Sequence, residues 1–91
     1  MLYTISWKGS LETRNAAIAR FLKTGGLPPD GVKMLGRWHV VGTNAGMAVA
    51  ETNDPALMQK WSLDWTDLLE MDVRPVLTDE QAGPLLAGIV T

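Results

Sequence analysis

The residues best suited to chemistry stand together in the short segment Arg37-Trp38-His39, which holds the sole histidine of the chain. Side chains of a β-strand alternate between two faces, so a strand here would turn Arg37 and His39 to one side and Trp38 to the other. An imidazole titrates near neutral pH and can act as a general base, and a guanidinium can hold a carboxylate or an enolate. The segment therefore combines a cationic, titratable face with an apolar one.

Arg37 and His39 also fit a purely structural role. Both could lie in an interface between two copies of the chain and hydrogen-bond to the partner, and the sequence favours this role over catalysis. No serine or cysteine nucleophile signature accompanies His39, so a catalytic triad is not expected. His39 is therefore the candidate general base and Arg37 the candidate anion-binding residue, with the interface role left open.

Four tryptophans are many for a chain of 91 residues. Together with Tyr3 and Phe21 they could line a pocket between a sheet and its helices, because ligand sites are concave and mostly apolar with few polar groups. The candidate ligand-binding residues are Tyr3, Trp7, Trp38, Glu51, Trp61 and Trp65. The alternative is that the aromatic side chains fill the core, with Glu51, Asp64 or Asp67 accepting hydrogen bonds from buried indole N–H groups.

The composition excludes several kinds of site. The chain has no cysteine and one histidine, so disulfides, thiolate metal sites and multi-histidine sites are ruled out within one chain. Asp64 and Asp67 are one helical turn apart, but we interpret them as part of a solvated acidic face. The glycines at 25–26 and the loop at 28–31 match no phosphate-binding pattern. We expect neither a bound metal nor a cofactor.

The net charge and the hydropathy of the chain limit the kinds of partner that the protein could bind. A net charge of −2 without a run of basic residues argues against nucleic acid. No segment approaches the roughly 20 apolar residues that span a bilayer, and the N-terminus lacks the basic and apolar regions of a signal peptide. We therefore expect a cytoplasmic protein without a membrane partner.

Hydrophobic periodicity predicts six regular elements and a tail. Residues 2–7, 32–41, 46–52 and 70–77 alternate as strands, and residues 11–24 and 56–69 follow a helical period. Ser10 and Asp54 suit the N-caps of the helices. Pro75 cannot donate to a ladder, so the last strand is expected to lie at a sheet edge or to bend there. The order β-α-β-β-α-β is the ferredoxin-like pattern of an α+β domain, a four-stranded antiparallel sheet with both helices on one face. This domain spans residues 1–80, and residues 81–91 form a C-terminal tail.

The alternation also assigns faces to the strands. The positions expected to face the helices are Tyr3, Ile5, Trp7, Met34, Trp38, Val40, Met47, Val49, Val73 and Leu77. The positions expected on the open face are Leu2, Thr4, Leu35, Arg37, His39, Val41, Ala48, Ala50, Arg74 and Val76. In the favoured hairpin register Trp38 pairs with Val49 and Glu51 lies near Gly36. A shift by one residue would place Glu51 opposite Arg37 and exchange the faces of the third strand.

The expected open face carries too many leucine, valine and alanine residues to remain wet. A symmetric homodimer with sheet packed on sheet would cover it, and small residues such as Ala48 and Ala50 would let the second sheet approach closely. The alternative is a monomer whose apolar tail shields the sheet. We favour the homodimer.

Several segments resemble a small bacterial family known only as a domain of unknown function. They are Met1-Leu2-Tyr3, residues 17–22, residues 25–39 with the specific Gly36-Arg37-Trp38-His39 motif, residues 51–55, and the pattern Trp61, Trp65 and 67–69. That family is similar in architecture to the dimeric α/β-barrel superfamily, which includes cofactor-free monooxygenases, muconolactone-isomerase-like enzymes and stress-induced proteins. The resemblance implies this fold, a dimer, and an aromatic ligand site between sheet and helices, but no established activity.

Three functions remain open. The first is a homodimeric small-ligand-binding or regulatory module without catalysis. The alternative is a cofactor-independent isomerase or monooxygenase that acts on a small apolar or aromatic compound. In that enzyme His39 would be the base, Arg37 the anion clamp and the tryptophans the wall. The third is a structural subunit of a larger assembly.

Overall fold

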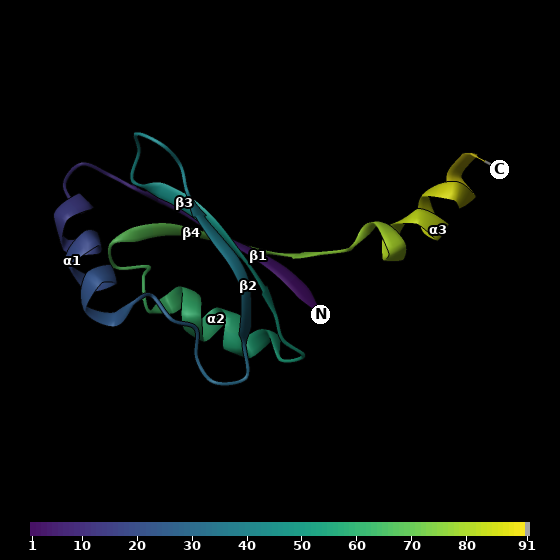
Figure 1. Ribbon diagram of the computed structural model, residues 1–91, viewed down its shortest axis with the longest axis horizontal. Helices are drawn as coiled ribbons and strands as arrows, with labels where there is room; N and C mark the ends of the chain where they lie inside the picture. The colour runs from purple at the N-terminus through teal and green to yellow at the C-terminus, as the bar shows by residue number, and fades with distance from the viewer. Residues whose placement is uncertain (91) are drawn as a thin grey trace.

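The computed structural model describes residues 1–90, which form an α+β structure with a four-stranded antiparallel sheet and three helices (Figure 1). The elements are β1 (Leu2–Gly9), α1 (Arg14–Thr24), β2 (Lys33–His39), β3 (Ala45–Glu51), α2 (Pro55–Leu63), β4 (Leu69–Val76) and α3 (Asp79–Val90). The strands lie in the order β2-β3-β1-β4, so β4 with its Pro75 is an edge strand. The predicted α+β class, the four antiparallel strands and the edge position of the last strand are confirmed.

Local signals explain where α2 begins and where α1 ends. The Asp54 side chain accepts a hydrogen bond from the Ala56 N–H at 3.0 Å, so Asp54 is the N-cap as predicted. Pro55 occupies the first helical turn of α2, where its missing N–H costs nothing. Gly25 ends α1 in the left-handed conformation, with φ of 74°, and donates its N–H to Phe21.

Two predicted helix boundaries are wrong. Helix α1 begins at Arg14 with Thr13 at its N-cap, whereas the Ser10 hydroxyl lies 3.2 Å from that of Thr13 instead of capping. Helix α2 ends at Leu63, because the Trp65 N–H bonds back to Ser62 and the chain turns into β4.

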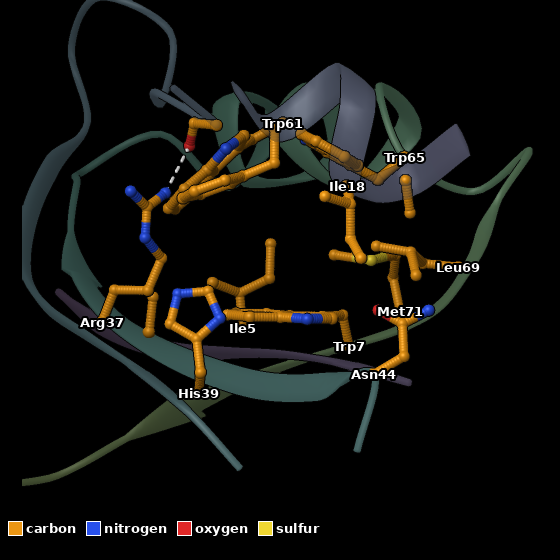
Figure 2. A pocket seen from close by; sticks show the side chains of 14 residues that line it. Ile5, Trp7, Ile18, Arg37, His39, Asn44, Trp61, Trp65, Leu69 and Met71 are labelled. Atoms are coloured by element: carbon orange, nitrogen blue, oxygen red, sulfur yellow. Dashed lines mark hydrogen bonds between the residues drawn. The ribbon is translucent and has the colours of Figure 1, made fainter. Parts of the chain in front are cut away.

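Helices α1 and α2 lie on the same side of the sheet (Figure 2). The core lies between α2 and the sheet and consists of Tyr3, Ile5, Val32, Ala48, Ala50, Met58 and Trp61. Helix α1 buries only Ala17 and leaves Ile18 and Leu22 exposed. Because α1 packs so lightly, space remains between it and the sheet.

A β-bulge at Leu35 overturns the predicted faces of β2. Before it Met34 pairs with Ala50, and after it Arg37 pairs with Ala48 and His39 with Gly46. The inserted residue changes the phase of the alternation, so Met34, Arg37 and His39 all face the helices. Trp38 pairs with Met47 and faces away from them. The predicted faces of Arg37, Trp38 and His39 were therefore wrong, because the alternation was counted through the bulge.

The predicted register and faces of β3 are wrong as well. Trp38 pairs with Met47 instead of Val49, and Glu51 pairs with Lys33, so neither register considered from the sequence occurs. Ala48 and Ala50 are 1% and 0% exposed and lie opposite Ile5 and Tyr3 on the helix-covered face. Small residues of β3 sit beside large residues of β1, whereas the larger Met47 and Val49 of β3 turn outward.

Helix α3 extends away from the sheet (Figure 1). Its first turn carries a capping box, in which the Gln81 N–H donates to the Thr78 hydroxyl and the Thr78 N–H donates to the Gln81 side chain. The helix continues past Pro84, in the segment that the sequence analysis described only as a tail. Its large apolar side chains are exposed, namely Leu85, Leu86, Ile89 and Val90. The division into residues 1–80 and a tail of 81–91 stays a prediction.

The radius of gyration is large because α3 extends away from the sheet. At 15.3 Å it exceeds the roughly 12 Å of a compact chain of this length. None of the helices in residues 1–90 combines the length and apolarity that crossing a bilayer requires.

We expect Gly46→Ala to destabilise the fold by about 1–3 kcal/mol. A Cβ at Gly46 would overlap the Trp7 ring and lie 2.5 Å from the Trp38 carbonyl oxygen. Gly83→Ala in α3 is the matched control, because a Cβ there meets no atom within 4 Å. Urea unfolding checks this, and equal midpoints for the two variants would contradict the packing described.

Candidate functional site

A cavity of about 120 Å³ lies between the sheet and the two helices that cover it (Figure 2). Its lining residues are Ile5, Trp7, Ala17, Ile18, Phe21, Gly26, Arg37, His39, Asn44, Ala48, Trp61, Trp65, Leu69 and Met71. Most of them are apolar, and none carries a carboxylate. The site is therefore an apolar chamber with a few polar groups.

Aromatic side chains form opposite walls of the cavity. In Figure 2 Trp7 lies along the sheet, and Trp61 and Trp65 lie on the helical side. The Trp7 ring fits there because it packs on Gly46, the residue directly opposite it on β3. Trp61 is 4% exposed and fixed in the core, so one wall of the cavity is rigid.

Arg37 and His39 stand at one end of the cavity (Figure 2). The Arg37 guanidinium donates hydrogen bonds to the carbonyl oxygens of Gly26 at 2.9 Å and Gly25 at 3.0 Å, just past the C-terminus of α1. It also lies 4.7 Å from the centre of the Phe21 ring, in cation–π contact. Arg37 therefore crosses from the sheet to the helical layer and fixes the end of α1.

The His39 ring packs between two aromatic rings. Its centroid lies 5.5 Å from that of Trp7 and 5.6 Å from that of Phe21, both in edge-to-face geometry. The ring makes no hydrogen bond to any residue between 1 and 90. Its two nitrogens are therefore available at the mouth of the cavity, where the side chain remains exposed.

Asn44 supplies a third polar group to the lining, in the turn between β2 and β3. Its side-chain Nδ2 is buried and has no hydrogen-bond partner within residues 1–90. A buried amide without a partner is costly, so this donor is a candidate for contact with a bound molecule or water.

A salt bridge holds α1 over the cavity. Arg20 of α1 forms a bidentate pair with Asp67, with both N···O distances 2.7 Å, and donates to the Asp64 carbonyl oxygen at 2.8 Å. Its guanidinium also lies 5.5 Å from the Trp65 ring centre. The hydrogen bond from Arg20 lowers the pKa of Asp67 below its ordinary value. We call this contact the Arg20–Asp67 clasp.

The structure brings some of the predicted site residues together and separates others. Arg37, His39, Trp7, Trp61 and Trp65 all line the cavity. Three others, Tyr3, Trp38 and Glu51, do not. Tyr3 is buried in the core, Trp38 is 58% exposed on the open face of the sheet, and Glu51 is exposed opposite Lys33.

Sequence reasoning missed Ile18, Asn44 and the Arg20–Asp67 clasp. Asn44 had a turn signal but no sign that its amide would be buried, and the clasp joins residues 47 positions apart. As for metals, residues 1–90 bring no three His, Asp or Glu side chains into an arrangement that could hold an ion.

We expect Asp67→Asn to loosen α1, because it removes the charged partner of Arg20. Hydrogen exchange should show faster exchange of the amides in residues 14–24. Asp64→Asn is the matched control, since the hydrogen bond from Arg20 to Asp64 goes to its backbone oxygen and survives the substitution. Equal protection of α1 in the two variants would rule out the clasp as the contact that holds the helix.

The same measurement has a defined pH dependence in the unchanged protein. A lowered pKa of Asp67 stabilises the folded form above the ordinary aspartate value of about 4, and this contribution is lost as the pH falls through the lowered value. Protection of α1 attributable to the clasp should therefore hold at neutral pH and decline only below about pH 4. Asp67→Asn should lack this decline.

Comparisons with known proteins agree with the family resemblance noted in the sequence. None of the curated proteins compared with the chain matches it. The model of the family described as "Domain of unknown function (DUF3303)" matches residues 1–90. The predicted resemblance to an uncharacterised family is confirmed, whereas the motif of residues 36–39 and the link to the dimeric α/β-barrel superfamily stay predictions. The chain belongs to the DUF3303 family.

Proposed function

We propose that the protein is a small-ligand-binding or regulatory module that holds a small apolar or aromatic compound between its sheet and helices. The observation that carries this proposal is the chamber itself, whose walls are apolar and whose few polar groups gather at its ends. Sites for small molecules have this character. An apolar cavity of about 150 Å³ binds benzene, so a volume near 120 Å³ limits the ligand to about one ring.

The light packing of α1 supports ligand exchange. This helix buries only Ala17. It is held by the Arg20–Asp67 clasp, by ring contacts of Arg20 and Phe21, and by the bonds from Arg37 to the two glycines that follow it. Helices held by a few polar contacts open at lower free energy than core elements. A ligand therefore enters and leaves by movement of α1, while the wall formed by Trp61 stays fixed.

We also propose that the protein is a homodimer through the open face of the sheet, with ferredoxin-like, dimeric α/β-barrel architecture. The element order β1-α1-β2-β3-α2-β4 supports the ferredoxin-like part. The exposed apolar residues Trp38 and Met47, side by side on that face, support the dimer. The exposed apolar side chains of α3 add further surface that a second copy would cover.

A second candidate function is a cofactor-independent isomerase or monooxygenase for a small apolar or aromatic compound. The placement of His39 favours it, because the ring lies at the cavity mouth with both nitrogens unbonded and Arg37 beside it. His39 would act as the base and Arg37 would hold the developing anion. The two functions differ at His39, since catalysis needs a ring nitrogen that takes up a proton from the substrate and binding does not.

Binding in the cavity predicts a selective effect on the tryptophans. In a ¹⁵N–¹H spectrum titrated with one-ring compounds, the indole signals of Trp7, Trp61 and Trp65 should shift. The signal of Trp38 on the far face of the sheet should stay unchanged. Ile18→Phe, which fills the cavity from α1, should weaken binding about tenfold or more.

Leu22→Phe is the matched control for Ile18→Phe, because Leu22 lies on the same helix, is 76% exposed and does not line the cavity. It should leave the affinity unchanged. Changes confined to the indole signal of Trp38, or no change of any indole signal with any one-ring compound, would contradict the proposed site.

Dimerisation through the open face predicts that Trp38→Lys yields a monomer in sedimentation at micromolar concentration, where the unchanged protein is a dimer. A lysine at position 38 would bury a charge in the interface. Val41→Lys is the control, because Val41 is 97% exposed and lies outside the strands. A monomeric unchanged protein, or a dimer that survives Trp38→Lys, would contradict this interface.

A further inference from the structure

The cavity has an unbalanced charge. Arg37 is the one permanently ionised side chain in its lining, and no lining residue is acidic. The ion pairs of residues 1–90 are Arg20–Asp67 and Arg74–Asp72, so Arg37 has no carboxylate partner in the part of the chain that is described. Its contacts are two neutral carbonyl oxygens and the Phe21 ring.

Arg37 keeps unused donors. A guanidinium has five N–H groups in a planar fork, and two of them serve Gly25 and Gly26. Those two bonds and the cation–π contact with Phe21 fix the plane of the group, so the remaining donors are held in place. A fixed fork of this kind matches a carboxylate, which accepts two parallel hydrogen bonds.

His39 adds a second donor at the same end. A neutral imidazole carries one N–H, and the His39 ring makes no hydrogen bond to residues 1–90. In Figure 2 the His39 ring and the Arg37 side chain lie next to each other on the same side of the cavity. Together they place two groups that can donate hydrogen bonds at one end of the cavity.

The surroundings of Arg37 make an anion favourable there. A cation that lies among aromatic and aliphatic groups is partly deprived of water, and a charge in such surroundings is stabilised when an opposite charge pairs with it. The rest of the chamber offers aromatic walls, with Trp7 on the sheet side and Trp61 on the helical side (Figure 2). One end therefore suits a negative group and the remainder suits a ring.

We infer that the cavity takes a one-ring aromatic carboxylate, with its ring between Trp7 and Trp61 and its carboxylate at Arg37 and His39. This inference rests on the proposed ligand site and specifies its ligand class. The size follows from the cavity of about 120 Å³, and the charge follows from the unpaired Arg37.

The test compares two ligands of nearly the same shape, benzoate and its neutral analogue benzamide, by calorimetry and by the indole signals of Trp7 and Trp61. Benzoate should bind at least tenfold more tightly than benzamide to the unchanged protein. Arg37→Gln should remove this preference, so that the two compounds bind to that variant with equal affinity. Arg14→Gln removes the same charge from α1 outside the cavity and should keep the preference.

The outcomes distinguish an error in the proposed ligand class from an error in the proposed site. Equal binding of both compounds, or tighter binding of benzamide, would overturn the carboxylate while leaving the proposed site intact. Binding of neither compound would overturn both. The comparison of ligands in the unchanged protein gives an answer even where Arg37→Gln fails to fold because α1 has lost its anchor.

Discussion

The candidate site depends on one extra residue in β2. The bulge at Leu35 reverses the alternation, so that Met34 before it and Arg37 and His39 after it all face the helices. Without the bulge the strand would present Trp38 to the helices, and the cationic pair would lie on the open face. A bulge of this kind re-aims side chains without changing the topology of the sheet. It gives the apolar chamber its polar end, and it gives the open face its exposed tryptophan.

Two further constraints keep the chamber open. The strand beside Trp7 and Ile5 carries Gly46 and Ala48 at the facing positions, so the large rings of β1 are not met by large side chains of β3. Helix α1 contributes one fully buried residue to the fold and is held by polar contacts, Arg20 with Asp67 at one place and Arg37 with Gly25 and Gly26 at another. Small residues on one wall and a lightly packed helix on the other leave space between the layers. Arg37 thus links the strand that carries the bulge to the helix that covers the cavity.

Hydrophobic periodicity predicted the α+β class, the order of the first six elements and the edge position of the strand with Pro75, because these follow from local patterns.

Periodicity gave the wrong strand faces where a single inserted residue shifts the alternation of side chains along a strand. Gly36 inside a strand was the available signal for the bulge, since such a glycine often marks one. Likewise Thr78 and Gln81 form a capping box at the start of α3, a local signal next to a segment that was expected to be a tail. The glycine and proline at 83–84 have low helix propensity and hide this helix from a reading of the sequence. The Arg20–Asp67 clasp could not be predicted, because nothing local relates residues on opposite sides of two strands and a helix. Two of the predicted ligand residues, Trp38 and Glu51, lie away from the cavity because the face assignments did not allow for the bulge and the true register. Tyr3 faces the helices as predicted, but it is buried in the core and does not line the cavity.

The direction of the His39 side chain tests this account most directly. Proton–proton NOEs should connect the His39 ring with the rings of Phe21 and Trp7, because the centroids lie 5.6 Å and 5.5 Å apart. The Trp38 ring should show no NOE to Phe21. NOEs from the His39 ring to Met47, together with contacts between Trp38 and Phe21, would show an unbulged strand and would contradict the placement of the site.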